Sequence, residues 1–182
     1  MKIALITNSR IPSLTANSIQ AMKVAQALMQ LGHDARMFAP AETEPVSQQL
    51  LITHYGVRLI PPLELLPSIS GLKRLDFIVH AQRAAQKFGA ELIYTWLPQS
   101  AALALWMKYP VVLEMHADVT GLMGAWWLRQ FWNAKGKKTM TVTTSALRNV
   151  LERSTKLKLE NEAVIVAPNG VELERYASLP SP

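Results

Sequence analysis

The chain has 182 residues and no cysteine, which excludes disulfide bonds, thiolate metal sites and cysteine nucleophiles. Hydrophobic residues make up 49% of it and charged residues 18%, a balance typical of one globular domain and not of a disordered chain. The net charge of +6 favours anionic partners in general. No RNA-binding signature, zinc-finger spacing or aromatic-basic alternation accompanies that charge, so we expect no nucleic-acid partner.

Apolar runs in the sequence have the length of strands and are too short to span a bilayer. The N-terminal segment, residues 1–8, carries one basic residue and an apolar core too short for a signal peptide. Together these features favour a cytoplasmic protein.

Runs rich in Ile, Val and Leu alternate with longer stretches of helical periodicity along the chain. This order predicts an α/β fold, a Rossmann-like doubly wound parallel sheet of about seven strands with helices on both faces. Gly32 is suited to end the first helix. The expected strands are 2–7, 33–39, 57–60, 91–95, 111–115, 139–143 and 163–167. The expected helices are 17–31, 46–55, 71–88, 99–108, 122–132 and one that begins near 145.

Ligands of such sheets bind outside the carboxyl ends of the strands, so the loops there carry the candidate site. The first loop, residues 8–18, contains no glycine, which excludes the dinucleotide fingerprint and the phosphate-binding P-loop. It carries Arg10 and ends in Asn17 and Ser18 at the start of a helix. Free amides at that helix end could hold an anion. Alternatively, Asn17 and Ser18 only cap the helix.

Two further loops contain candidate residues. The apolar run 111–115 leads to His116 at the end of a strand, where a histidine is either a hydrogen-bonded loop residue or a catalytic group. Trp96 follows another strand and could stack on a sugar face, or else pack beneath the loop.

Four stretches taken in order, 17–34, 111–116, 143–148 and 164–176, resemble family 4 glycosyltransferases with the GT-B fold. Many members of that family have a Gly-Gly pair beside the donor phosphate and the acceptor, where this chain has Asn17 and Ser18. The resemblance implies that His116 lines the catalytic cleft and contacts the acceptor or the transferred sugar. It also implies that Thr144 or Ser145 leads a helix, for which a capping role is sufficient.

The resemblance further implies a domain organisation and an activity. Residues 1–167 would form the N-terminal, acceptor-side domain, and residues 168–182 would begin the interdomain hinge, with Asn169 and Gly170 beside the site. The donor-binding domain would be absent, so we expect the chain alone to be inactive. The complete enzyme would transfer a sugar with retention from a nucleotide-activated donor to a hydroxyl of a glycan or lipid-linked glycan. No cofactor and no metal ion would be required.

Residues 122–132 contain three of the five tryptophans, and lysines follow them. Such a helix is either buried against the sheet with a solvated basic end or lies on an anionic membrane surface. The second interpretation predicts a protein peripheral to the inner face of the membrane. The predicted membrane contacts are Trp126, Trp127, Lys135, Lys137 and Lys138. Two other hypotheses remain open: a noncatalytic module that binds a nucleotide or sugar phosphate, and a membrane-associating interaction domain.

Overall fold

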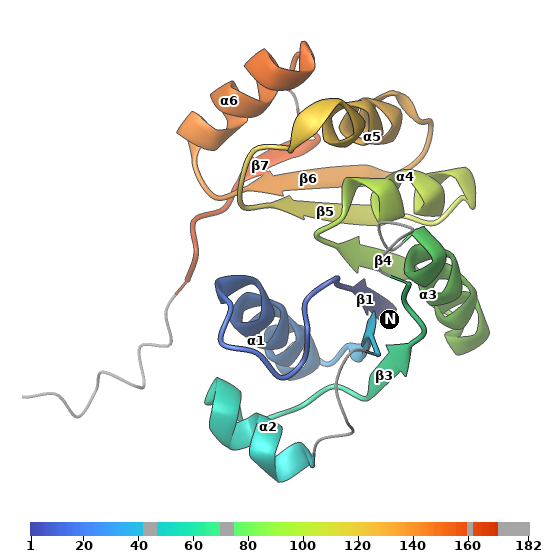
Figure 1. Ribbon diagram of the computed structural model, residues 1–182, viewed down its shortest axis with the longest axis vertical. Coiled ribbons are helices and arrows are strands. Elements are labelled where there is room, and N and C mark those ends of the chain that lie inside the picture. The colour runs from blue at the N-terminus through green and yellow to red at the C-terminus, as the bar shows by residue number, and fades with distance from the viewer. Residues whose placement is uncertain (42–46, 70–74, 160–161, 171–182) are drawn as a thin grey trace, which may run out of the picture.

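The computed structural model describes residues 1–41, 47–69, 75–159 and 162–170. They form a parallel sheet with helices packed on both of its faces (Figure 1). The strands are β1 (Lys2–Ile6), β2 (Asp34–Pro40), β3 (Leu63–Leu66), β4 (Leu92–Thr95), β5 (Val111–Met115), β6 (Lys138–Val142) and β7 (Val164–Val166). The helices are α1 (Ala16–Gln30), α2 (Gln48–Tyr55), α3 (Leu75–Phe88), α4 (Pro98–Trp106), α5 (Gly121–Asn133) and α6 (Ser145–Thr155). The predicted fold class is confirmed.

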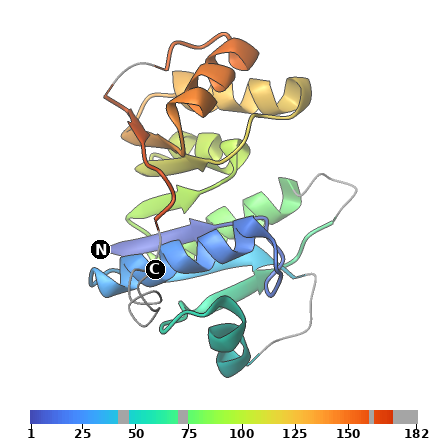
Figure 2. The ribbon, with the colours of Figure 1, turned by 90° about the vertical axis from the view of Figure 1, so that its left-hand side faces the viewer.

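The strand order is β3-β2-β1-β4-β5-β6-β7, so the chain moves outward from β1 in one direction and then in the other. Right-handed crossovers therefore place α1 and α2 on one face and α3 to α6 on the opposite face. Two separate apolar clusters reflect this division. One contains Met22 of α1 and Leu51 of α2, and the other contains Phe77 of α3, Leu128 of α5 and Leu151 of α6. Figure 2 shows α1 lying lengthwise against β1 and β2.

The reversal of strand order occurs between β1 and its two neighbours, β2 and β4. In an open α/β sheet the loops diverge at such a point and leave a crevice at the carboxyl ends of the strands. The loop from β1 to α1, the loop after β4 and the loop after β5 all meet there. The fold thus positions the loops that the sequence singled out.

The third strand was predicted at residues 57–60, and this prediction was wrong. β3 begins instead at Leu63, which pairs with Met37 of β2 at the edge of the sheet. Val57 is buried directly after α2, and its N–H donates to the carbonyl of Ile52. Val57 is apolar because it fills the core next to α2, whereas Leu59 is exposed. Pro62 can precede an edge strand because its carbonyl still accepts a hydrogen bond from Met37.

Two helix ends lie where the local sequence predicted them, at Gly32 and Thr144. Gly32 has φ +81°, and its N–H donates to the carbonyl of Met29 while His33 donates to Leu28. These two bonds form a Schellman motif, as expected for a left-handed glycine after a helix. Thr144 accepts a hydrogen bond from the N–H of Leu147 at 3.0 Å, so its capping role is also confirmed. None of the helices in the described ranges has the length and apolarity needed to cross a membrane.

Candidate functional site

A cleft of about 650 Å³ lies at the carboxyl ends of β4 and β5. Its walls come from the loop after β1, the start of α1, the loops after β4 and β5, and the first turns of α5. The residues that line it are Asn8, Ser9, Asn17, Leu75, Trp96, Leu97, Pro98, Gln99, Glu114, Met115, His116, Ala117, Asp118, Val119, Thr120, Met123, Gly124 and Trp127. The cleft therefore sits at the crevice that the strand order creates.

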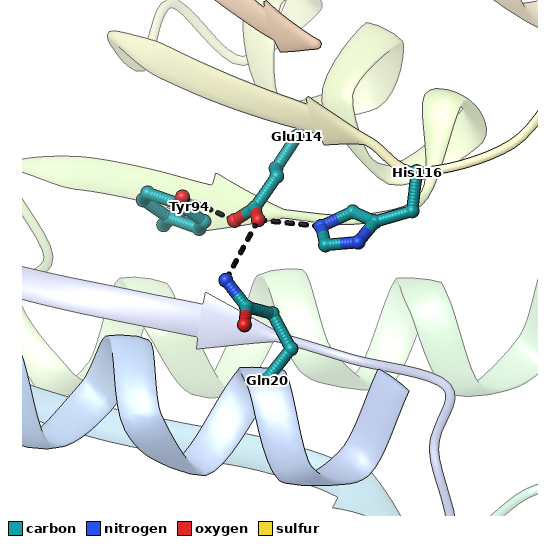
Figure 3. A network of polar contacts seen from close by, with 4 residues as sticks. All are labelled: Gln20, Tyr94, Glu114 and His116. Carbon is teal, nitrogen blue, oxygen red and sulfur yellow. Dashed lines mark hydrogen bonds and ion pairs between the residues drawn. The ribbon is translucent and has the colours of Figure 1, made fainter. Parts of the chain in front are cut away.

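Inside the cleft, Glu114 of β5 is the centre of a polar network (Figure 3). Its Oε1 lies 2.5 Å from Nε2 of His116 and accepts a hydrogen bond from Nε2 of Gln20 at 3.2 Å. Its Oε2 accepts from the hydroxyl of Tyr94. Glu114 is 8% exposed, so these bonds largely replace water around the carboxylate. Three elements, α1, β4 and the β5 loop, converge on a single acid.

The hydrogen bonds determine the charge of that acid. Burial alone raises the pKa of Glu114. The hydrogen bonds from His116, Tyr94 and Gln20 and the charge of His116 lower it. Together they leave the pKa of Glu114 below its ordinary value. Burial and the neighbouring Glu114 raise the pKa of Tyr94 well above its ordinary value. At neutral pH the network therefore contains an ionised Glu114 and a neutral Tyr94 that donates to it.

The beginning of α1 forms the opposite wall of the cleft. Its N-cap is Thr15, whose hydroxyl accepts from the N–H of Ser18, so the alternative in which Asn17 and Ser18 cap the helix is incorrect. Ser18 is fully buried, and its hydroxyl donates to the carbonyls of Ser13 and Thr15. The sequence did not single out Thr15, because Thr, Asn and Ser are all favoured as helix N-caps and Thr15 stands only two residues before Asn17.

Residues 18–175 match Glycosyltransferase Family 4. The chain belongs to this family. The match extends over most of the sequence and includes β5, His116 and α1 from Ser18 onward. The resemblance inferred from the sequence is thereby confirmed, and the protein is a family 4 domain of the GT-B type.

Solved structures share the fold of this family 4 domain. HepE from Anabaena, crystallised with UDP and glucose, matches with a TM-score of 0.63 and 16% identity over 97% of this chain and 46% of its own. Sucrose-phosphate synthase from Thermosynechococcus elongatus matches with a TM-score of 0.64 and 17% identity over 95% of this chain and 49% of its own. A UDP-GlcNAc 2-epimerase from Methanocaldococcus jannaschii, in complex with UDP-GlcNAc and UDP, matches with a TM-score of 0.62 and 13% identity over 91% and 46%.

The family 4 domain spans about half the length of the solved structures that it matches. No curated protein matches it by sequence. Because these sequence identities are below 20%, the structural likeness shows a shared fold and nothing further.

The predicted site residues of the family 4 domain divide into two groups. His116, Asn17 and Trp96 line the cleft. The ring of Trp96 lies 5.2 Å from that of Tyr94, and its buried indole N–H has no hydrogen-bond partner among the described residues. Ser18 and Arg10 do not line the cleft: Ser18 is fully buried, and Arg10 is exposed.

The hinge residues also lie outside the cleft. Asn169 and Gly170 follow β7 and are exposed. Gly170 does not have a left-handed φ, and nothing lies within 4 Å of the position that a Cβ would take. The remainder of the predicted hinge, 171–182, is outside the described residues.

Helix α5 presents different residues to the cleft and to solvent. Trp127 lines the cleft, and its ring packs edge-on against Trp126, 4.6 Å away. Trp126 is exposed, as are Leu122 and Met123. These three residues line a second hollow of about 520 Å³ together with Arg129, Gln130 and Asn133. Met123 lines both hollows, so α5 separates the cleft from an apolar surface by the width of one helix.

The position of α5 depends on Gly124. A Cβ on this glycine would lie 3.2 Å from the Cβ of Val119, which is closer than nearly all such contacts. Gly124 thus allows the helix to pack directly against the loop that follows His116.

The lysines after α5 have unequal surroundings. Lys135 and Lys137 are exposed. Lys138 instead turns inward, and its Nζ donates to the carbonyls of Trp132 and of Ala134, the latter at 2.6 Å. Burial lowers the pKa of Lys138. Its ammonium group is bonded to the carbonyls at the C-terminal end of α5. Of the three lysines predicted to contact a membrane, Lys135 and Lys137 are therefore the ones exposed to solvent.

Glu114, Tyr94 and Gln20 were missed by reasoning from the sequence. A signal for Glu114 was present, because it is a charged residue in a strand that is otherwise apolar. Tyr94 and Gln20 have no such signal, since only the folded sheet places them beside Glu114. Among the described residues, no group of three His, Asp or Glu side chains is arranged to hold a metal ion.

Proposed function

We propose that this family 4 domain forms the acceptor-side wall of the active site of a retaining glycosyltransferase. The observation that carries the proposal is the family match over residues 18–175 together with His116 in a cleft at the strand-order reversal. Residues 1–167 would be the acceptor-side domain and residues 168–182 the start of the hinge. A second domain, which holds most of the donor, would close over the cleft.

The donor is proposed to be a nucleotide sugar, used as a substrate without a further cofactor. Supporting this, HepE was crystallised with UDP and glucose, and the epimerase with UDP-GlcNAc and UDP. The N-terminus of α1 adds physical support because Asn17 lines the cleft. A helix N-terminus carries a positive partial charge and free amides, which suit a diphosphate across the cleft.

The chemical task is to stabilise an oxocarbenium-like centre and a departing diphosphate. We propose attack of the acceptor hydroxyl on the same face from which the diphosphate leaves, with a phosphate oxygen accepting the hydroxyl proton. His116 would orient or polarise the groups and would not act as a nucleophile. Trp96 would contact the sugar through its ring.

The acceptor is proposed to be a glycan or a lipid-linked glycan. Helix α5 supports the second choice, because the exposed Leu122 and Trp126 lie directly beside the cleft, with Lys135 and Lys137 just beyond. An apolar face next to basic residues suits an anionic membrane surface. The protein would then act as a peripheral protein at the cytoplasmic face of a membrane.

The decisive experiment measures sugar transfer from a panel of nucleotide sugars by the product of the complete gene, with the 182-residue chain alone in parallel. We expect transfer by the complete protein and none by the chain alone. His116→Ala should lower kcat by about 100-fold, whereas His80→Ala, an exposed histidine on α3, should leave it unchanged. Transfer unaffected by His116→Ala would overturn the role of His116.

The same assay separates transfer from two other outcomes. The fold also occurs in an epimerase, so the donor is incubated without acceptor and the released sugar is identified. An epimerised sugar would replace the transferase proposal with isomerisation. Binding of nucleotide sugars with no turnover of any kind would instead support a noncatalytic module.

A further inference from the structure

We propose that Glu114 is a positioning residue for His116: its carboxylate accepts a hydrogen bond from Nε2–H of the neutral imidazole and leaves Nδ1 as a hydrogen-bond acceptor in the cleft. The tautomer follows from the structure of the domain. The partner assigned to Nδ1, a hydroxyl of the acceptor, rests on the proposed function.

The first step of the argument is the geometry of the contact. Oε1 of Glu114 and Nε2 of His116 are 2.5 Å apart, which requires a proton between them. An ionised carboxylate only accepts hydrogen bonds, so Nε2 must donate. Of the two neutral tautomers of His116, this contact therefore permits the Nε2–H form; the imidazolium makes the same contact but carries a proton on Nδ1 as well.

The second step is that Glu114 is itself held in place from outside its own loop. Tyr94, on the neighbouring strand β4, donates to Oε2, and Gln20, on α1, donates to Oε1 at 3.2 Å. With three donors on a carboxylate that is 8% exposed, rotation of the side chain would leave buried polar groups unpaired. These bonds also lower the pKa of Glu114, which supports its ionised state at neutral pH.

The third step concerns the other ring nitrogen of His116. Figure 3 shows the ring with Nε2 toward Glu114 and Nδ1 turned away from it. Within the described residues no group bonds to Nδ1, and the side chain lines the cleft. In the Nε2–H form, Nδ1 has a lone pair, and a hydroxyl of the acceptor could donate to it. That hydroxyl would be a neighbour of the attacking one, so its bond to Nδ1 would orient the acceptor while the attacking hydroxyl gives its own proton to the phosphate oxygen.

The test begins with the 182-residue chain and does not need activity. Its four histidines give few enough signals for two-bond ¹⁵N–¹H spectra to assign each tautomer above neutral pH, with His116→Gln identifying the signals of His116. We expect His116 as the Nε2–H form, with its Hε2 proton slowed in exchange with water. In Glu114→Gln the amide can donate to Nε2, so the Hε2 signal should broaden or the proton should move to Nδ1.

A matched variant separates positioning from general loss of structure. Tyr94→Phe removes one donor to Glu114 but keeps the Nε2 contact, so its His116 tautomer should equal that of the wild type. Urea unfolding verifies that each variant is folded. A wild-type Nδ1–H form, or an unchanged Hε2 signal in folded Glu114→Gln, would overturn the proposal.

The second arm uses the complete protein and the transfer assay. Misplacement of a positioning group costs up to about 100-fold in rate, so Glu114→Gln should lower kcat within that range with little change in the donor KM. Combined with His116→Ala it should cost no more than His116→Ala alone, because the residues act as a unit. Additive losses, or wild-type kcat in Glu114→Gln, would exclude action through His116. If no variant transfers sugar, the proposed function fails and the tautomer is decided by the spectra.

Discussion

Gln20 and Glu114 are separated by 94 residues, yet the side-chain amide of one donates to the carboxylate of the other at 3.2 Å. The contact joins α1, on one face of the sheet, to β5, on the far side of the strand-order reversal. It therefore links a helix and a strand that are not adjacent along the chain. The stability of the domain should depend on the ionisation of this carboxylate.

The first prediction is a loss of stability in acid that requires Glu114. Because the pKa of Glu114 is lower in the folded state, the unfolded state binds more protons, and stability rises with pH through this window. The contribution is complete above the ordinary pKa of about 4.3 and is lost as the pH falls through the lower folded value. Urea unfolding at neutral pH and below pH 4 should show a smaller acid loss in Glu114→Gln than in the wild type. The exposed Glu64 provides the control, and a Glu64→Gln variant should behave like the wild type.

A second prediction concerns the end of α1. Gly32→Ala should lower the free energy of unfolding by about 1 kcal/mol, because alanine is disfavoured at φ +81°. Gly170→Ala is the matched control, since Gly170 lacks a left-handed φ and has open space around it. Equal effects of the two substitutions in urea unfolding would contradict the role assigned to the Schellman motif.

The third prediction tests the inward turn of Lys138. Lys138→Met removes the ammonium group that bonds the carbonyls at the end of α5, and we expect a loss of about 1–2 kcal/mol. Lys137→Met, one residue earlier and exposed, should change the free energy of unfolding by less than about 0.5 kcal/mol. A similar small effect at both positions would show that the carbonyl contacts contribute nothing measurable.

A fourth prediction examines membrane contact at α5. The chain should co-sediment with vesicles of mixed neutral and anionic phospholipid at low salt, and Leu122→Ser/Trp126→Ala should reduce the bound fraction several-fold by removing exposed apolar area. Leu31→Ser is the control, because Leu31 is also an exposed apolar residue but lies at the end of α1. Salt should weaken binding through screening of Lys135 and Lys137. Binding that is absent in the wild type, or that Leu31→Ser reduces equally, would remove the membrane proposal.

The sequence predicted those features that depend on neighbouring residues. The alternation of apolar runs with helical periodicity was sufficient for the parallel sheet, and Gly32 and Thr144 indicated helix ends because capping is local. β3 was misplaced because a buried apolar residue such as Val57, next to α2, looks in the sequence like the start of a strand. Both His116 and Trp96 reach the cleft because the carboxyl ends of parallel strands share one edge.

The remainder depends on contacts between distant elements. Ser18 was assigned to the site because the sequence does not show which of Thr15, Asn17 and Ser18 lies outside the helix. Lys138 was grouped with its neighbours, although β6 begins there and turns its side chain toward α5. Tyr94 and Gln20 gain a role only through the register of β4 with β5 and the packing of α1.

The close approach of Gly124 to Val119 has a mechanical consequence. Because Gly124 has no side chain, α5 packs directly on Val119 of that loop, and Met123 belongs to both the outer hollow and the cleft. We therefore expect a substitution or ligand that displaces α5 to displace the loop beside His116 as well. The apolar outer surface and the cleft thus lie on the two sides of a single helix.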